Sequence, residues 1–545
     1  MSTPRPSLVV TGQIVVTARP DGLETAEAIG IADGSVMMTG SARDVREAAA
    51  PDARLIEAGP LAVVPGLHDF HLHLVGMARA RRTVDLEGTR SMDEIVARVA
   101  SAAGTLPPGS WVLGDGWHTE VLAAAQLSRL ESVLAGRPAL LKSHDRHSAW
   151  ASGAALQRAG ITHHSTDPQG GRFERDAGGR LNGLLRESAA DLVARHAARI
   201  VGESLDETLH EVAQELSGLG ITGVTDAGDA TDGNGNGPYA ALGDSFSSLA
   251  AAERIFEGRL RATLNLPADA VDAAANLGLR TGHPLPDAPW MRVGWAKVYA
   301  DGALGSRTAA LFMPYTCGEG EQRGILRIGP DDLDGFLRRS RRAGIGLAMH
   351  AIGDRAVSAV LDGLHRGPAR AGDLPPDRVE HAQLVRPADR SRLAALGVTA
   401  SVQPIHLPSD RQAAEDCWAG RLQDAYAFGS LAAAGALLAF GSDAPIENAN
   451  PWHGIFAAVR RTALDDASAP WMPSEALTAE AAISAFTLGP ARAAARSDLG
   501  HLRPGARADL AVLNVDLATL LAADERLGST RSQVTVVDGS EVHGA

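Results

Sequence analysis

Cysteine is almost absent from this chain of 545 residues, which has only Cys317 and Cys417. Neither lies in a Cys-x-x-Cys pair, so a disulfide scaffold and a thiolate zinc site are both unexpected. Two unpaired thiols are typical of a reducing compartment. We therefore expect a cytoplasmic protein that folds without disulfide bonds.

Long apolar runs are lacking as well. No stretch of about 18 consecutive apolar residues occurs, which is the length that a helix needs to cross a membrane. The apolar segment that starts at Leu8 is too short for a signal peptide and has no small-residue cleavage site. We expect a soluble protein with no membrane partner.

Basic residues are in deficit, because 51 Lys and Arg stand against 65 Asp and Glu, for a net charge of −14. The acidic residues are spread along the chain, which favours solubility and disfavours a nucleic-acid partner. Aromatic residues make up only 4%, but hydrophobic residues make up 45%, enough for a sizeable core. The composition therefore excludes global disorder.

Short apolar segments alternate with helical patterns through most of the chain. Such alternation indicates a parallel sheet, and eight units of this kind indicate an α/β fold, the (β/α)8 TIM-like barrel. In this fold the active site lies at the carboxyl ends of the strands. The predicted strands cover residues 62–64, 220–225, 261–266, 292–299, 346–349, 378–380, 398–402 and 437–440.

The two ends of the chain both have strand patterns, so we expect them to meet in one small β-sandwich domain. An α/β segment is inserted after the first barrel strand. The predicted boundaries are 1–60 and 499–545 for the β-sandwich, 61–81 for the first barrel strand with its metal motif, 82–200 for the insertion and 201–498 for the barrel.

A His-x-His pair, His71 and His73, follows the first predicted strand. Side chains at positions i and i+2 of an extended segment point to the same side. Two neutral imidazoles on one side can hold one metal ion. Surface histidines also occur at this spacing by chance, so the pair needs support from the rest of the chain.

That support comes from the ends of other predicted strands, where further ligand-type residues recur. All of them are expected at the same end of the barrel. Six such side chains at the correct end are unlikely to be a coincidence of structural residues. The candidate set is His71, His73, Lys297, His350, His381 and Asp443.

These segments resemble the amidohydrolase superfamily, and within it the amidohydrolase-3 group that includes N-substituted formamide deformylases. The resemblance covers nearly the whole chain. It rests on motifs such as Pro65-Gly66-Leu67 before His71, Lys297-Val298-Tyr299-Ala300-Asp301-Gly302, His350-Ala351-Ile352-Gly353-Asp354, Glu380-His381-Ala382-Gln383 and Gly441-Ser442-Asp443-Ala444-Pro445. The motifs are specific for the family and far less so for the substrate.

The resemblance implies a metal site in which His71, His73 and Asp443 hold one ion and His350 and His381 a second. Lys297 would bridge the two ions as a CO2-derived carbamate. If Lys297 is instead an unmodified lysine paired with Asp301, a single ion is expected. Nitrogen and oxygen ligands favour Zn2+, with Mn, Fe and Co as alternatives.

Catalysis would use Asp443 as general base and then general acid, with Lys297 as the metal bridge. Four further residues are candidates for substrate binding, and each has a structural alternative. His147 and His406 would donate to the oxyanion or be packed histidines, Trp117 would line an apolar pocket or be buried in the insertion, and Arg307 would orient a carboxylate or bind Asp301. The neighbouring His68 is expected behind the site or in a structural role.

The leading functional hypothesis is hydrolysis of a C–N bond in a small-molecule amide, N-formyl or N-acyl, by metal-activated hydroxide. One alternative is a hydrolytic deaminase or cyclic-amide hydrolase with the same metal site. Another is a catalytically silent metal-binding barrel. The sequence does not identify the substrate, and it is compatible with a homodimer.

Overall fold

The computed structural model describes residues 5–106, 109–117, 127–144, 148–168, 171–201, 205–228, 237–318 and 320–544. Its contacts divide the chain into two compact units. One unit combines Met1–Leu74 with His210–Ala545, and the other is Val75–Leu209, within which the predicted insertion at 82–200 lies. None of the helices in the described ranges is long and apolar enough to cross a membrane.

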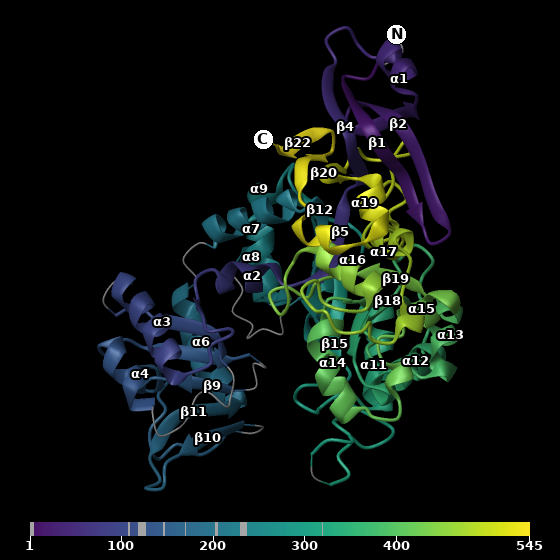
Figure 1. Ribbon diagram of the computed structural model, residues 1–545. Helices are drawn as coiled ribbons and strands as arrows, with labels where there is room; N and C mark the ends of the chain where they lie inside the picture. The colour runs from purple at the N-terminus through teal and green to yellow at the C-terminus, as the bar shows by residue number, and fades with distance from the viewer. Residues whose placement is uncertain are drawn as a thin grey trace. The chain divides into compact units, whose positions relative to one another are not determined.

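The first unit contains the predicted barrel, a nearly closed sheet of eight parallel strands (Figure 1). Most of the residues in these strands are buried, as is typical of a parallel sheet covered on both faces. The strands, in their order across the sheet, are β19 (Leu437–Phe440), β18 (Thr399–Val402), β17 (Arg378–His381), β16 (Leu347–Ala351), β15 (Ala288–Tyr299), β13 (Arg261–Pro267), β12 (Ile221–Asp226) and β5 (Leu67–Leu72). The predicted fold class is confirmed.

Helices connect successive strands on the outside of the barrel. They include α11 (Pro330–Ala343), α12 (Asp354–Arg366), α13 (Pro387–Ala395), α14 (His406–Cys417), α15 (Phe428–Ala433) and α16 (Pro451–Arg460). In α12, Val357, Val360 and Leu361 are buried, at the i, i+3, i+4 spacing of an amphipathic helix. Gly344 ends α11 in the left-handed conformation, which costs glycine least, and turns the chain into β16.

Both termini contribute to one seven-stranded sheet, as predicted (Figure 1). Its order joins the last strands of the chain to the first ones, because β20 pairs antiparallel with β4. The strands are β22 (Ser540–His543), β21 (Ser532–Val537), β20 (Leu510–Asp516), β4 (Arg54–Pro65), β1 (Leu8–Arg19), β2 (Gly22–Ala32) and β3 (Ser35–Gly40).

The predicted first barrel strand was wrong by a few residues. Residues 62–64 belong to β4 of the terminal sheet, and β5 of the barrel starts only after Gly66. β4 and β5 follow each other almost without a break in the sequence. The apolar run therefore indicated that these residues are buried, but it did not indicate the sheet to which they belong. A Cβ atom at position 66 would lie 2.1 Å from the Thr222 hydroxyl oxygen, so only glycine fits between the two strands.

The second unit is an α/β insertion built on a six-stranded sheet. The strands are β10 (Gly171–Arg175), β11 (Leu181–Glu187), β9 (Ser148–Ala151), β8 (Ala139–Ser143), β7 (Val112–Trp117) and β6 (Val84–Asp85). An apolar cluster that includes Ile95 and Val99 of α3 (Met92–Thr105) and Leu130 of α4 (Leu127–Leu134) packs on this sheet.

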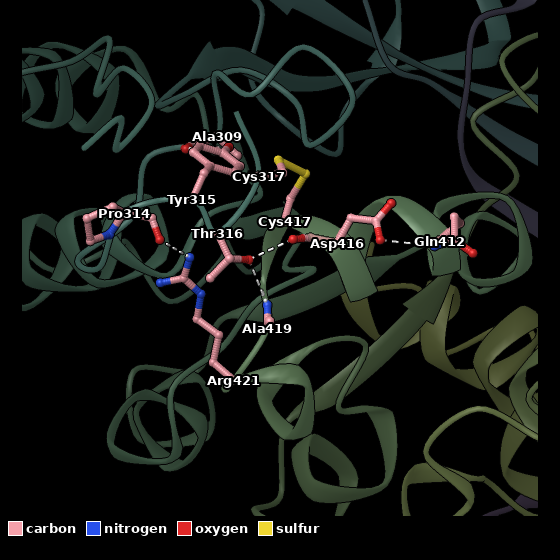
Figure 2. The surroundings of a disulfide bond; sticks show 10 residues. All are labelled: Ala309, Pro314, Tyr315, Thr316, Cys317, Gln412, Asp416, Cys417, Ala419 and Arg421. Atoms are coloured by element: carbon pink, nitrogen blue, oxygen red, sulfur yellow. Dashed lines mark hydrogen bonds between the residues drawn. A yellow bond between two sulfur atoms is a disulfide. The ribbon is translucent and has the colours of Figure 1, made fainter. Parts of the chain in front are cut away.

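The two cysteines form a disulfide, contrary to the expectation of two unpaired thiols (Figure 2). Cys317, in the segment after β15, is bonded to Cys417 at the end of α14. Thr316 also links these two segments by hydrogen bonds. Its amide donates to the Cys417 carbonyl at 3.0 Å and its hydroxyl to the Asp416 carbonyl at 2.7 Å. A sequence separation of 100 residues left no local motif that could reveal the pair.

Candidate metal centre

The barrel brings the six candidate metal-binding side chains to one end. His71 and His73 come from the end of β5, Lys297 from β15, His350 from β16, His381 from β17 and Asp443 from the segment after β19. The ring centroid of His381 lies 5.0 Å from that of His71 and 4.5 Å from that of His350. Five of the six residues are buried or nearly so, and His73 is 19% exposed.

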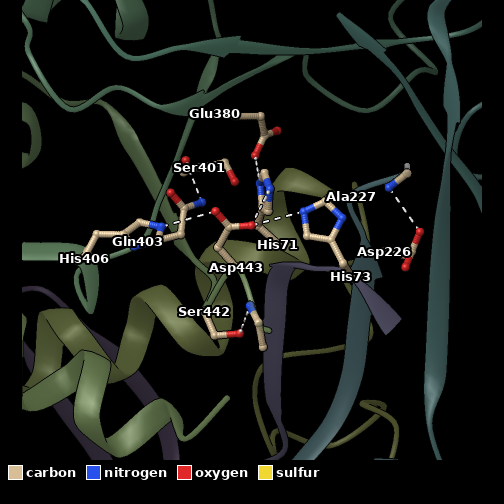
Figure 3. Close-up of polar contacts among 12 residues, drawn as sticks. His71, His73, Asp226, Ala227, Glu380, Ser401, Gln403, His406, Ser442 and Asp443 are labelled. Carbon is tan, nitrogen blue, oxygen red and sulfur yellow. Dashed lines mark hydrogen bonds and ion pairs between the residues drawn. The ribbon is translucent and has the colours of Figure 1, made fainter. Parts of the chain in front are cut away.

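Asp443 lies between His71, His73 and His406 (Figure 3). Its Oδ1 is 3.1 Å from Nε2 of His73 and 3.5 Å from Nε2 of His71. Its Oδ2 is 3.2 Å from Nε2 of His406. Asp443 therefore belongs to two groups of potential ligands, one with His71 and His73 and one with His381 and His406.

The second group contains His406, which was expected to bind substrate, and does not contain His350, whose ring centroid nevertheless lies 4.5 Å from that of His381. Nε2 of His350 lies 3.1 Å from the Gly302 carbonyl oxygen. His406 begins α14 directly after β18, and its Nδ1 is 3.4 Å from a carboxylate oxygen of Glu447.

A buried ion pair holds His71 in orientation. Nδ1 of His71 is hydrogen-bonded to the carboxylate of Glu380, which Arg378 also contacts at 2.5 and 2.9 Å. All three side chains are almost completely buried, and the Arg378 guanidinium lies 4.0 Å from the ring centroid of Phe70. A carboxylate at Nδ1 leaves Nε2 as the metal-binding nitrogen, which is the usual arrangement behind a metal-bound histidine.

Asp69 joins the two chain segments that carry the site. Its Oδ1 accepts the amide hydrogens of His71 and Ser442, both at 3.1 Å. Burial raises the pKa of this carboxyl to about 7, although the two hydrogen bonds act in the opposite direction. Asp69 thereby fixes the spacing between His71 and the segment of Asp443.

The electrostatics keep His71, His350 and His381 neutral, whereas the hydrogen bonds to Asp443 and Glu447 outweigh burial and raise the pKa of His406 to about 10. Burial, followed by the charge of Lys297, lowers the pKa of His71 to about 4 and that of His350 to about 3. Burial would raise the pKa of Asp443, but its interactions with His71, His406 and His73 hold it well below the usual range. Neutral imidazoles and an ionised carboxylate are the forms that bind a metal ion.

The donor set fits a divalent metal ion. Nδ1 of His381 is buried and has no hydrogen-bond partner in the described part of the chain, which is costly unless a ligand takes it up. Imidazole nitrogens with one shared carboxylate are the ligands that zinc accepts, and other divalent transition metals accept them too.

The alternative considered above, an ion pair between Lys297 and Asp301, is not found within the described ranges. The Asp301 carboxylate accepts backbone amides of Ala310, Ile352 and Gly353 at 2.8 to 3.0 Å. Lys297 itself is 4% exposed, and its Nζ lies 5.3 Å from the centroid of the Tyr299 ring.

The other predicted substrate-binding residues are placed less favourably. Trp117 is fully buried in the apolar core of the insertion and donates its indole N–H to the Leu141 carbonyl at 2.9 Å, which favours the structural alternative over a pocket wall. Arg307 is exposed, and its own amide donates to the Leu304 carbonyl. His147 lies outside the described residues.

Sequence reasoning assigned no role to Glu380, Arg378, Asp69 or Glu447. Glu380 precedes His381 in β17 and so carries a charge inside a buried strand, which was the one available signal. Its partner His71 is 309 residues away, so the contact itself could not be found from the chain.

Comparisons with known proteins show the family to which the chain belongs. A model of the amidohydrolase family matches residues 54–543. The chain is 31% identical over 542 residues to YtcJ of Bacillus subtilis (strain 168), which is named as an amidohydrolase, and the match covers 98% of each chain. It is 28% identical over 524 residues to the N-substituted formamide deformylase of Arthrobacter pascens, with 91% of each covered.

The solved structure of an uncharacterized metal-dependent hydrolase from Pyrococcus furiosus has a TM-score of 0.72 and 26% identity, over 92% of this chain and 97% of that one. The chain belongs to the amidohydrolase family, as its motifs predicted, and it is a hydrolase.

Proposed function

We propose that this protein hydrolyses the C–N bond of a small-molecule amide, with N-formyl and N-acyl amines as the first candidates. The observation that carries the proposal is the position of Asp443, which is shared by two groups of buried metal-type ligands. The similarity to an N-substituted formamide deformylase supports the choice of N-formyl compounds.

A divalent ion held by His71, His73 and Asp443, zinc in our proposal, would lower the pKa of water and supply hydroxide near neutral pH. Oδ1 of Asp443 lies 3.1 Å from Nε2 of His73, so the carboxylate would take a proton from the attacking water and would pass it to the leaving nitrogen. The Glu380–His71 contact keeps the ligand nitrogen in place during this step.

We assign Lys297 to a carbamate formed with CO2, and so to a site with two ions. An ammonium group buried beside three neutral imidazoles would repel a cation, whereas an anionic carbamate would bind it. A 13C resonance that appears on incubation with 13C-bicarbonate, and is absent from Lys297→Ala, tests this assignment. Its absence from the metal-loaded wild type contradicts it.

His406 is our candidate for the hydrogen-bond donor to the developing oxyanion. Its Nε2 contacts Oδ2 of Asp443, whereas His71 and His73 contact Oδ1. Glu447 at its Nδ1 holds the ring, and a donor in such a position stabilises charge that forms in the transition state.

The experiment is a substrate screen with product identification on protein of measured metal content. N-formyl, N-acyl and cyclic amides and amino-substituted heterocycles are compared, with and without chelator. We expect an acid and a primary amine from the acyclic amides, with turnover that is lost on chelation and restored by zinc. Release of ammonia from the heterocycles alone would favour a deaminase, and turnover that survives complete metal removal would contradict the proposal.

A further inference from the structure

A polar cavity lies at the opposite end of the barrel from the metal centre. It has a volume of about 120 Å3 and is lined by the amino-terminal ends of β12, β13 and β15 and by the chain around Gly66 and 487–500. One water needs only about 10–15 Å3, so the cavity has room for a small polyatomic ligand. Four arginines line it, Arg261, Arg292, Arg496 and Arg507, and we call it the arginine cavity.

The carboxylates near these arginines are fewer than the arginines. Asp509 pairs with Arg261 at 2.7 Å. Asp538 pairs with Arg507 at 2.6 Å and with Arg261 at 3.3 Å. Asp498 pairs with Arg496 at 2.7 Å and lies 3.8 Å from Arg507. Four guanidinium groups thus share three carboxylates, which leaves one positive charge in a protein whose net charge is −14.

Arg292 carries the unmatched charge. Nη1 of Arg292 donates to the Gly282 carbonyl at 2.5 Å. No carboxylate lies within ion-pair distance of it in the part of the chain that the structure describes. Burial, followed by the charge of Arg496, lowers the pKa of Arg292 to about 10, so the side chain stays protonated near neutral pH.

The positive character continues into an adjoining cavity of about 400 Å3, which shares Arg496 and Leu499 with the first. Its lining adds further basic side chains, namely Arg19, Arg492, His501 and Arg503. Glu24 is ion-paired with Arg503, so this second group is only partly neutralised. Concave surfaces lined by one sign of charge concentrate small ions of the other sign.

We propose that the arginine cavity binds a small oxyanion of the phosphate class, with Arg292 as its principal ligand. Guanidinium groups match the paired oxygens of such an anion through parallel N–H donors. An anion there would balance the one excess charge and relieve the repulsion between Arg292 and its neighbours. The site is separate from the metal centre and from the amide chemistry proposed above.

Isothermal titration with inorganic phosphate, at constant ionic strength set with chloride, tests the site. Glycerol 3-phosphate forms a parallel arm that distinguishes the free anion from the phosphate group of an organic molecule. We expect binding to the wild type and to Arg338→Gln, an exposed arginine of α11. Arg292→Gln should bind at least about tenfold more weakly, because a charge-assisted hydrogen bond is lost.

Thermal melting separates this role from a structural one. Without phosphate, Arg292→Gln should melt at the wild-type temperature or above it, since like-charge repulsion is removed. With phosphate, the wild type should gain stability and Arg292→Gln should not. If Arg292→Gln does not fold, Arg292→Lys is compared, for which we expect weaker binding because lysine lacks the forked donors.

Phosphate can also bind a metal ion, so Asp443→Asn is titrated in parallel. We expect this variant to retain the phosphate site. Three results would overturn the proposal: no binding to the wild type, equal affinity of the wild type and Arg292→Gln, or binding that is lost in Asp443→Asn and kept in Arg292→Gln.

Discussion

Nδ1 of His71 is hydrogen-bonded to the buried carboxylate of Glu380, so only Nε2 of this histidine faces Asp443. Because the carboxylate orients the ring, Glu380→Gln should weaken metal binding about 10- to 100-fold, the usual effect of losing such a partner. Metal content after dialysis against a series of chelator concentrations measures the change. Asp331→Asn, an exposed acid of α11, is the control, and equal metal retention in both variants would show that Glu380 does not orient the ligand.

The shared position of Asp443 predicts different metal losses in two variants. Asp443→Asn removes the one carboxylate common to both ligand groups, and His73→Asn removes a ligand of one group only. We therefore expect Asp443→Asn to lose all bound metal and all turnover, and His73→Asn to lose about half of the metal that the wild type holds. Metal analysis and circular dichroism on the same samples check this. A wild type with one ion, lost equally in both variants, would contradict the two-ion site.

His406 can be separated from the metal ligands by the same measurements. If it donates to the oxyanion, His406→Asn should lower kcat about 10²- to 10³-fold and leave the metal content unchanged. His365→Asn, on an exposed position of α12, is the control for loss of a histidine. Loss of metal in step with loss of activity would instead make His406 a ligand.

The barrel could be predicted because most of its strands lie in short apolar segments that alternate with helical patterns, and several of them carry ligand-type residues at the carboxyl end. The same periodicity could not assign residues 62–64, since an apolar run shows burial and not the sheet that buries it. Trp117 illustrates a second limit. Its surroundings in the sequence resemble a loop, but Trp117 ends β7 and its ring fills the core of the insertion.

Contacts between distant segments account for the rest of what the sequence could not show. The partners of His71 and Arg292, and the pairing of Cys317 with Cys417, join residues that no local pattern links. The reason first given for a cytoplasmic location, two unpaired thiols, is removed by the disulfide. The location itself remains a prediction.

The disulfide predicts that unreduced, denatured protein has no titratable thiol, and that reduction exposes both. The double variant Cys317→Ser/Cys417→Ser should melt at a lower temperature, because a bond that closes a loop of 100 residues restricts the unfolded chain by up to about 4.7 kcal/mol. The reduced wild type is the matched control and should melt like the variant. Two reactive thiols without reductant would show that the bond does not form.

Arg461 is a fully buried arginine whose guanidinium donates to two carbonyls, those of Trp471 and Tyr426, both at 3.0 Å. Burial lowers its pKa to about 10, and the charge is held against the face of Phe428 at 5.3 Å. Arg461→Ala leaves both carbonyls unsatisfied and opens a cavity. The expected cost is about 2–4 kcal/mol, seen as a lower midpoint of guanidinium unfolding.

Arg461→Met separates the two contributions to that cost. Methionine fills most of the volume and buries no charge, so its destabilisation should be smaller than that of alanine and should report the lost hydrogen bonds. Arg342→Ala, at an exposed position of α11, should leave the midpoint unchanged. If Arg461→Ala unfolded at the same midpoint as this control, the guanidinium would not stabilise the junction of α16 with the segments around Tyr426 and Trp471.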